Sequence, residues 1–432
     1  MDAETRKAKL TELRANENNV AMTGIPLRYK GSTLTVKVYR IPLVYLVYNK
    51  YNGRIGTEIK SYETQYGSLD PENRTDSLII EDFLYKSKED RNRVTMESLQ
   101  RNRQQRYGIV TADGIIIDGN RRAMLLNRLF RNRGSEIHKQ FSLSEVDHCQ
   151  YFLAIILPDN AEEKDIQQLE TIYQMGEDDK LDYNPIQKYL KCKELKRFFD
   201  VDAIADFMGE KPGTIREWLS ILKLMEEYLD EYGYSGIYTR LEKTEGPFVD
   251  LNSYLDSYKK HVGSVSQIDW NYTDSDISDL KLVCFDYIRA RYEGKEFRDI
   301  AKTGKDGSLF FHHDLWTDFF KKHSDTISTI SEPTVEELRT SHPSEDLPRL
   351  LKSRDNAWTE ATKGELEGNL RRNVRKLEDK RDANKPRELL TRALSALKSV
   401  DQEQDSFLHD PNILDMVKEI NKITWEMKKV LD

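Results

Sequence analysis

The stretch IIIDGNRRAMLLNRL, residues 115–129, decides the fold of the first part of this chain. Its three isoleucines predict a buried strand, and the apolar residues of 123–129 recur at the spacing of one helix face. Asp118 and Gly119 stand between the two patterns, and glycine adopts backbone angles that other residues avoid. The sequence therefore predicts a strand, a tight turn and a helix in direct succession.

This turn places charged groups at the start of a helix. The backbone N–H groups of a first helical turn have no intrahelical acceptor, and together with the helix dipole they favour an anion. Arg121 and Arg122 add planar guanidinium groups suited to phosphate. Asp118 stands where a carboxylate can hold a metal ion or orient a nucleophile. The alternative is structural: Asp118 caps the helix, and the arginines pair with surface carboxylates.

Other strand and helix patterns lie on both sides of this motif. Alternating or apolar strand patterns occur at 34–43, 108–111, 115–117 and 151–158. A charged helical pattern covers 75–104, and residues 1–24 have the pattern of a short polar helix. The first 158 residues are therefore expected to form a small α+β domain.

From residue 162 onward the hydrophobic period changes to 3.6 residues, and strand patterns disappear. Residues 201–209 predict a short amphipathic helix with Asp202 as its N-cap, and it ends at a glycine. Residues 210–213 form a turn, and 214–222 predict a second helix. This pair has the pattern of a helix-turn-helix, whose second helix enters the major groove of DNA. The alternative is an ordinary helix pair in a bundle.

Four polar side chains of this helix pair are candidate contacts to double-stranded DNA: Lys211, Thr214, Arg216 and Lys223. Basic side chains at such positions neutralise phosphates, and polar ones donate hydrogen bonds. The alternative for each is a solvated helix face.

Charge and composition restrict the remaining classes of function. The net charge of −8 excludes a uniformly basic nucleic-acid coat, but residues 86–134 hold 12 Lys and Arg against 5 Asp and Glu, a local excess of 7. Cys149, Cys192 and Cys284 stand far apart and form no paired-thiolate motif, so we expect no structural metal. No apolar run approaches the ~18 residues that span a bilayer, and the charged N-terminus has no signal core. We therefore expect a cytoplasmic protein with no membrane partner.

The order of these motifs resembles the ParB/sulfiredoxin superfamily. Its members place a box of the type Gly-Glu-Arg-Arg between a strand and a helix and hold nucleotide phosphates with it; here the box is Gly-Asn-Arg-Arg at 119–122. Asn-Gly-Arg at 52–54 stands in the place of the family's first box, usually Gln-Pro-Arg. Glu-Thr-Ile-Tyr-Gln at 170–174 is nearest to its Glu-Asn-x-x-Arg box. The stretch 181–189 is similar to the entry into the family's central domain, and the resemblance covers residues 34–228.

The resemblance implies a nucleoside triphosphate, CTP or ATP with Mg²⁺, as the cofactor. The nucleotide-binding residues that it implies are Arg54, Gly119, Asn120, Arg121 and Arg122. The implied catalytic residues are Asp118, Asn120 and Glu170, and Glu170 is also the implied Mg²⁺ ligand. In this chain Asn120 replaces the glutamate implicated in hydrolysis, and Thr171 replaces the metal-holding asparagine. The resemblance therefore supports phosphate binding more strongly than it supports catalysis.

We expect five parts along the chain. They are an N-terminal helix (1–25), a ParB/sulfiredoxin-like phosphate-binding domain (26–158), a helix-turn-helix domain (159–238), a mixed, mainly helical domain (239–350) and a C-terminal helical region (351–432). In the last part, Leu366, Leu370, Val374 and Leu377 lie on one helical face. This face is interpreted as a dimer contact, a partner contact, a DNA-backbone contact or an ordinary surface helix on a bundle.

The leading hypothesis is a ParB-like, nucleoid-associated homodimer whose grip on double-stranded DNA is regulated by a nucleoside triphosphate that it binds and also hydrolyses. A second hypothesis is an ATPase or nuclease component of a DNA-modification or phage-defence system, acting with a modification or defence enzyme. A third is a non-catalytic scaffold that retains the fold.

Overall fold

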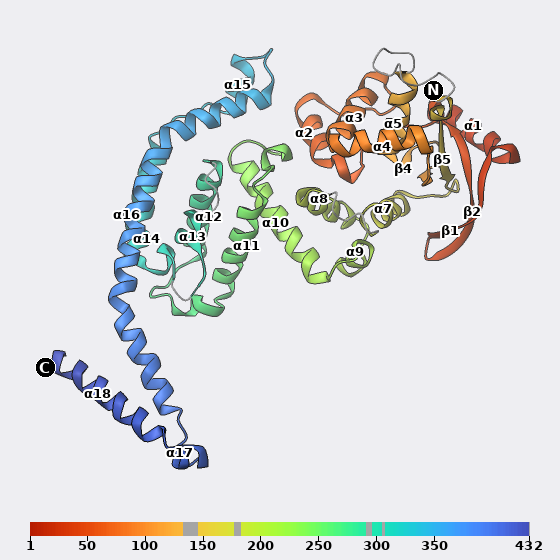
Figure 1. The fold of residues 1–432 in the computed structure, drawn as a ribbon. Helices are drawn as coiled ribbons and strands as arrows, with labels where there is room; N and C mark the ends of the chain where they lie inside the picture. Colours follow the sequence, from red (N-terminus) through yellow and green to blue (C-terminus); the bar gives the residue numbers. More distant parts are fainter. Residues whose placement is uncertain (133–145, 177–182, 291–295, 305–306, 432) are drawn as a thin grey trace.

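A computed structural model describes residues 1–132, 146–176, 183–290, 296–304 and 307–431 of the protein. A small mixed sheet and its helices form the first part, and the rest is helical (Figure 1). The elements of the first part are α1 (Ala3–Ala15), β1 (Val20–Tyr29), β2 (Ser32–Pro42), η3 (Gly53–Ile55), α2 (Gly56–Tyr66), α3 (Arg74–Lys86), α4 (Glu89–Asn102), β3 (Gly108–Val110), β4 (Ile116–Asp118), α5 (Asn120–Arg131), η5 (Asp147–Gln150) and β5 (Tyr151–Ile156).

The sheet has five strands in the order β1-β2-β5-β3-β4. All neighbouring strands are antiparallel except β3 and β5, which run parallel. The four strands expected from the sequence are present, and 108–111 and 115–117 do form a hairpin. β1 was not predicted, because residues up to 24 had the pattern of a helix that in fact ends at Ala15. Lys30 and Gly31, both at positive φ, form the two-residue turn that returns β1 onto β2.

The helical part begins after β5 and runs to the C-terminus. Its elements are α7 (Glu163–Thr171), η6 (Ile172–Gly176), α8 (Pro185–Leu195), α9 (Val201–Met208), α10 (Pro212–Glu231), α11 (Glu245–Lys260), α12 (Asp274–Arg289), α13 (Glu296–Ala301), α14 (His313–Ser328), α15 (Val335–Ser341), α16 (Leu347–Lys398), α17 (Asp405–His409) and α18 (Ile413–Leu431). Residues 181 and 182 of the stretch 181–189 lie outside the described residues.

The two helices of the expected helix-turn-helix are present as α9 and α10. Asp200, and not Asp202, caps α9, because its carboxylate accepts a hydrogen bond from the Ala203 N–H at 2.8 Å. Gly209 ends α9 in the left-handed conformation, as the turn requires. α10 begins at Pro212 and is 20 residues long, so it continues well beyond the predicted end at 222.

Some helices of this part contain prolines. Residues 245–260 form α11 with Pro247 in its first turn, where proline is tolerated because the N–H that it lacks has no intrahelical acceptor. Residues 313–328 form α14. α16 is 52 residues long and runs through Pro386.

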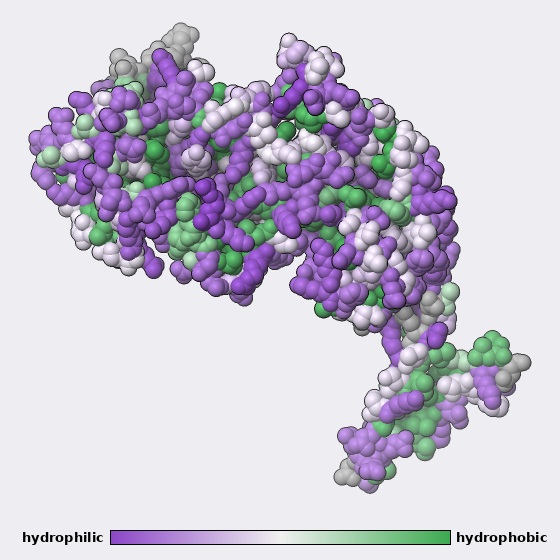
Figure 2. Space-filling model, turned by 180° about the vertical axis from the view of Figure 1, so that it is seen from behind, coloured by the Kyte–Doolittle hydropathy of each residue, from purple (hydrophilic) through white to green (hydrophobic). Residues whose placement is uncertain are grey.

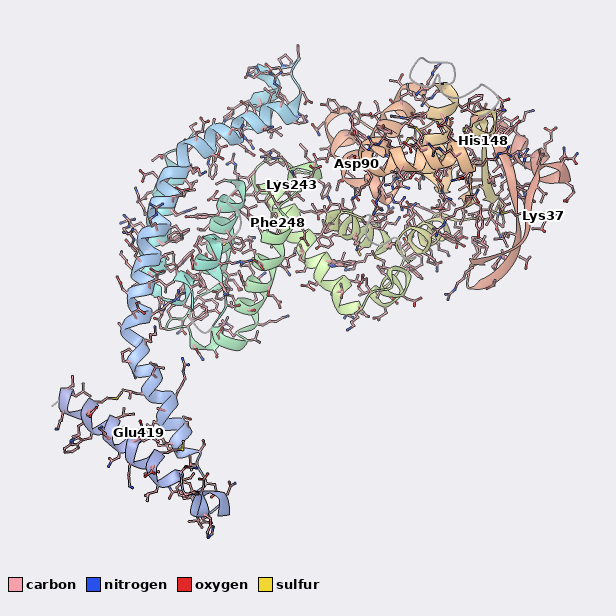
Figure 3. The ribbon with its side chains drawn as sticks, viewed as in Figure 1. Lys37, Asp90, His148, Lys243, Phe248 and Glu419 are labelled. Carbon is pink, nitrogen blue, oxygen red and sulfur yellow. The ribbon has the colours of Figure 1, made fainter. Side chains whose placement is uncertain are left out.

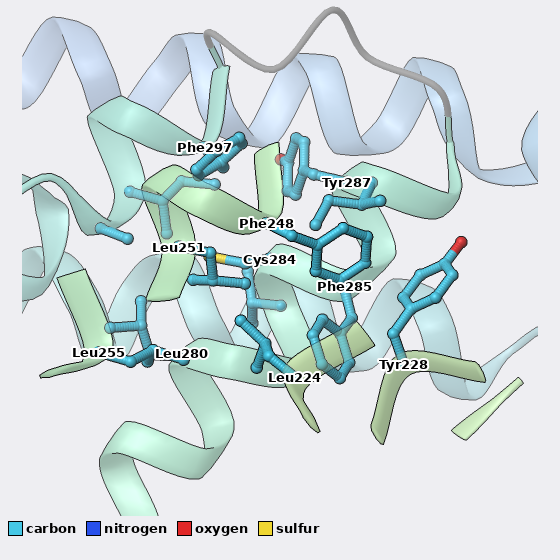
Figure 4. Packing of buried hydrophobic residues seen from close by; sticks show 14 of the residues in the cluster. Leu224, Tyr228, Phe248, Leu251, Leu255, Leu280, Cys284, Phe285, Tyr287 and Phe297 are labelled. Carbon is cyan, nitrogen blue, oxygen red and sulfur yellow. The ribbon is translucent and has the colours of Figure 1, made fainter. Parts of the chain in front are cut away.

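One apolar core extends from Ile186 in α8 to Leu377 in α16. The ring of Tyr228 lies 5.3 Å from that of Phe248 and 5.4 Å from that of Phe285, between centroids, and these side chains fill its centre (Figure 4). The core crosses the boundary expected at 238–239, so α8 and the second half of α10 pack with the helices that follow. A smaller cluster joins α9 to the start of α10.

The helix face of 366–377 packs onto this same core. Leu366, Leu370 and Leu377 are buried in it, and Val374 is partly buried against it. Of the four interpretations of this face, the structure supports a helix on its own bundle.

Arg289 fixes the long helix α16 to the bundle. It is buried on α12, pairs with Asp355 of α16 at 2.9 Å and lies over the ring of Trp358 at 4.4 Å. Among the described residues, no helix is long and apolar enough to pass through a bilayer.

A candidate anion site between the sheet and the helical part

Gly119 makes the turn between β4 and α5 possible. Its φ is +100°, and a Cβ at this position would lie 2.6 Å from Cζ of Phe152. Both the backbone angle and the contact exclude a larger side chain. α5 therefore begins directly at Asn120, with its first N–H groups and the positive end of its dipole beside the turn.

Asn120 holds this turn together. Its side chain is buried, donates from Nδ2 to the Ile116 carbonyl at 2.8 Å, and accepts from the Asn49 N–H at 2.9 Å. Both ends of the amide are therefore used to fix backbone segments. The structure places Asn120 as a positioning residue for the turn and for the chain that leads to Arg54.

Asp118 and Arg122 are partners of each other. The Arg122 guanidinium donates to the Asp118 carboxylate at 2.6 Å and to the carbonyls of Arg106 and Tyr107 at 2.6 and 3.1 Å. Arg122 thus connects the start of α5 to the residues that precede β3. The alternative interpretation was that the arginines of this motif pair with carboxylates. For Arg122 the structure shows such a pair.

Arg54 reaches the same region from η3. Its guanidinium lies 5.6 Å from the centre of the Tyr183 ring, and its Nε is buried with no acceptor among the described residues. A buried donor without an acceptor is rare in native proteins, and a ligand oxygen is one remedy. Arg54 is therefore placed to donate to an anion.

Tyr183 is the buried centre around which the candidate residues gather. Burial raises the pKa of its hydroxyl well above the ordinary value, Arg54 and Arg121 act to lower it, and Glu170 and Asp118 act to raise it. Four charged side chains from three separate segments thus act on one buried phenol. The side chains of Arg54, Asp118, Arg121 and Glu170 therefore lie near the Tyr183 hydroxyl.

The Tyr183 hydroxyl also connects the helical part to the sheet. It donates to Oε1 of Gln174 in η6, and Gln174 donates from Nε2 to the Ile117 carbonyl of β4 at 3.0 Å. These two bonds fix the distance between the start of α8 and the strand that ends in the glycine turn.

Glu170 forms a buried ion pair. Its Oε2 accepts from Nζ of Lys191 at 2.7 Å, and its Oε1 accepts from the Gly53 N–H at 3.2 Å. The side chains of Glu170 and Lys191 are each 1% exposed. Lys191 also donates to Gln167 at 2.5 Å. Burial raises the pKa of Glu170, while Lys191 and the Gly53 N–H act to lower it.

This arrangement does not fit Glu170 as a Mg²⁺ ligand. The Lys191 ammonium already supplies the cation at this carboxylate, and Arg122 does the same for Asp118. Within the described residues, no three His, Cys, Asp or Glu side chains come together to hold a metal. Mg²⁺ commonly keeps its waters and is held through substrate phosphates, which is the arrangement compatible with this site.

Sequence reasoning gave no role to Lys191, to Gln187, which donates to the Arg54 carbonyl at 2.6 Å, or to Gln174, the last residue of the box at 170–174. For Lys191 and Gln187 the sequence did contain a signal. Gln187 and Lys191 are four residues apart, so they share one helix face, and they stand among the apolar residues of α8. A lysine and an amide on such a face indicate a buried polar partner.

The candidate DNA contacts lie on α10 and at its N-cap. Lys211, Arg216 and Lys223 are exposed, and Thr214 is half-buried. Arg216 and Lys223 are seven residues apart and so share one face, about 10 Å from each other along the axis. The other two do not lie on that face, so the four residues do not form one patch.

Acidic residues surround these contacts. The Arg216 guanidinium lies 4.0 Å from the Asp202 carboxylate, and both side chains are exposed. Other carboxylates of the helix pair and its flanks include Asp200, Asp206, Glu210 and Glu217. Asp202 therefore competes with a DNA phosphate for Arg216.

Comparison of the chain with protein-family models, with curated proteins and with solved structures finds no match.

The buried pair gives a prediction about stability. Lys191→Met leaves Glu170 buried without its cation, which costs about 3–5 kcal/mol of unfolding free energy. Lys191→Met/Glu170→Gln removes both charges and keeps an acceptor for Gly53, so it is expected to recover most of that loss. Urea denaturation followed by circular dichroism measures both variants.

The matched control is Lys37→Met on β2, which removes the exposed ion-pair partner of Glu17 (Figure 3). It is expected to cost less than about 1 kcal/mol. A Lys191→Met variant as stable as Lys37→Met would contradict the interpretation of the pair as a structural requirement.

Proposed function

We propose that this chain is a ParB-like DNA-binding protein that binds a nucleoside triphosphate at the turn between β4 and α5. The nucleotide phosphates would lie at the N-terminus of α5, with Arg54 and Arg121 as their cationic partners. Arg122 and Asn120 would act indirectly, because they hold the turn and the neighbouring backbone in place.

The observation that carries this proposal is the buried Nε of Arg54 beside Tyr183. It supplies a donor without an acceptor in the described part of the chain, in the place where the charges of Arg121, Asp118 and Glu170 also meet. A phosphate oxygen is the acceptor that fits an arginine at a helix N-terminus.

Nucleotide binding at this place would reach the helix-turn-helix through α8. Gly53 and Arg54 are hydrogen-bonded to Glu170 and Gln187, and α8 packs along α10. A ligand that binds one arrangement of η3 and α8 better than another shifts the balance between them. The proposed role of the nucleotide is therefore to change how α10 meets DNA.

The geometry favours binding over hydrolysis. Asp118 and Glu170, the two carboxylates nominated as catalytic, each hold a cationic side chain, and the Asn120 amide is used by the backbone. A general base needs a free lone pair within reach of the attacking water. This observation supports the non-catalytic alternative for the reaction itself, while the binding proposal stands.

The nucleotide proposal predicts the effect of Arg54→Ala. The loss of one charge-assisted hydrogen bond, roughly 1.5–3 kcal/mol, weakens nucleotide binding about tenfold or more. Calorimetric titration with CTP, ATP, GTP and UTP in turn measures it, and phosphate release in the same samples is expected to stay at the background rate.

Arg14→Ala on α1 is the matched control, because Arg14 is exposed and far along the chain from this turn. Its affinity is expected to equal that of the wild type. If the wild-type chain bound no nucleotide, the nucleotide proposal would be wrong and only the scaffold hypothesis would remain. Rapid phosphate release with one nucleotide would instead favour an enzyme.

The DNA proposal predicts opposite effects for two neighbouring substitutions. Arg216→Ala removes a phosphate contact and is expected to weaken binding to a duplex several-fold and to reduce the salt slope by about 1. Asp202→Asn frees Arg216 from its competitor and is expected to strengthen binding. Fluorescence anisotropy at several salt concentrations measures both, and equal affinities for the two variants would exclude α10 as the DNA contact.

We also propose that α18 joins two copies of the chain. It is a 19-residue helix of which no residue is buried, and Leu414, Val417, Trp425 and Leu431 are among its exposed apolar side chains. Together with the exposed leucines at the end of α16, these residues contribute to the green patches among purple side chains in the projecting C-terminal part of Figure 2. Exposed apolar surface of this extent indicates a protein contact.

The spacing on α18 fits a second α18 as the partner. Residues 413, 417, 420, 424, 427 and 431 alternate in steps of four and three, and all except Thr424 are apolar. This is the pattern of a coiled-coil seam, in which each helix fills the holes of the other.

The dimer proposal predicts the mass in solution. Multi-angle light scattering is expected to give about twice 50.6 kDa for the wild type and the monomer mass for Val417→Asp/Met427→Asp. Glu419→Ala, off the seam on the same helix, is expected to remain a dimer (Figure 3). A wild-type monomer at micromolar concentration would contradict the proposal.

A further inference from the structure

A second basic region of the first domain lines a cavity that is partly open to solvent. The cavity has a volume of about 770 Å³ and lies where the end of β2, the C-terminal end of α4, η5 and the start of β5 meet. His148 of η5 marks it in Figure 3. Its volume is that of a pocket for a small molecule. Apart from Leu126 of α5, its lining is drawn from elements that contain neither Arg54 nor Gly119.

Among the described residues, three arginines line this cavity, Arg40, Arg101 and Arg103, together with one carboxylate, Asp147. In the part of the chain that the structure describes, none of the three guanidinium groups has a carboxylate within ion-pair distance. The Arg40 guanidinium instead lies 5.8 Å from the centre of the Tyr151 ring. In a chain of net charge −8, three such arginines around one cavity are a selective environment for an anion.

Arg103 adopts a backbone conformation that favours glycine. Its φ is +59°, and it is the residue that ends α4. A large side chain in this region costs free energy that a glycine would not, and such strain persists where the surrounding structure or a function requires it. The arginine side chain is therefore kept at this position at the expense of local stability.

The C-terminal end of α4 would by itself repel an anion, because its last carbonyls carry partial negative charge. Two of them are already occupied. The Leu99 carbonyl contacts Nε2 of His148 at 3.0 Å, and the Asn102 carbonyl accepts a hydrogen bond from Gln105. In the cavity wall, Gln100 is only 9% exposed, and its Nε2 has no acceptor among the described residues.

We propose that this cavity binds a small molecule that carries several phosphate groups. Planar guanidinium groups from two sides match phosphate oxygens, and the aromatic ring and amides leave room for an organic part. A volume of about 770 Å³ suits one small molecule, whereas the backbone of a nucleic acid needs a longer surface. The site is separate from the turn at Gly119.

The test uses inorganic tripolyphosphate as the probe and the full chain with Arg54→Ala, so that the turn at Gly119 contributes less. Calorimetric titration is expected to show binding that Arg40→Gln and Arg101→Gln each weaken about tenfold. Arg93→Gln, on the exposed side of the same helix α4 and outside the cavity lining, is the matched control and is expected to bind normally.

Arg103→Gly separates function from folding. It is expected to weaken tripolyphosphate binding about tenfold while its Tm stays equal to or above that of the parent, because glycine relieves the backbone strain. A lower Tm together with normal binding would show that Arg103 serves the fold alone, and would overturn its place in the site.

Two further outcomes would overturn the proposal. Equal weakening by Arg93→Gln and Arg101→Gln would show diffuse attraction to a basic surface. A 5′-phosphorylated single-stranded oligonucleotide that binds this cavity more tightly than tripolyphosphate, with the same response to Arg40→Gln, would assign it to nucleic acid. Neither result depends on whether nucleotide binds at Gly119.

Discussion

The arrangement of the two halves of this molecule depends on one buried ion pair, between Glu170 of α7 and Lys191 of α8. Both side chains are 1% exposed, so neither charge has water to stabilise it, and each requires the other. The second oxygen of Glu170 accepts from Gly53 in the N-terminal domain. One carboxylate thus fixes three segments that are more than a hundred residues apart in sequence at their extremes.

The same constraint would couple the proposed ligand at the sheet to the helical part. Gly53 precedes Arg54, and Lys191 lies on the helix that packs along α10, so a shift of η3 on ligand binding is opposed or transmitted by the pair. Tyr183 and Gln174 form a second connection, from the start of α8 to the carbonyl of Ile117. One connection thus runs to α8 from η3 and the other from β4, and together they restrict how α8 can move relative to the sheet.

Local pattern predicted the strand before Gly119, the glycine turn and α5, because each follows from residues within a few positions of one another. It did not predict α2, and it indicated one helical stretch at 75–104 where the structure has α3 and α4. β1 exists because β2 pairs with it, and the capping carboxylate of α9 is two residues earlier than expected. The convergence of Arg54 and Arg121 was predicted through the family resemblance, whereas Lys191 was not, because its partner Glu170 lies 21 residues away on another helix. Pattern indicates which residues face inward, but it does not indicate which polar groups meet there.

The arginines of this acidic chain fall into two groups, those with a carboxylate partner and those without one among the described residues. Arg6, Arg122, Arg128 and Arg289 each have a carboxylate within 3.1 Å, and each connects segments that the fold must hold together. Arg54 keeps a buried nitrogen without an acceptor in the described structure, and Arg40, Arg101 and Arg103 surround a cavity without carboxylate partners there. The chain has 75 acidic residues against 67 basic ones, so carboxylate partners for arginine are abundant. An arginine without a carboxylate partner is therefore one that the fold holds away from carboxylates. Such arginines are the ones that an external anion can use.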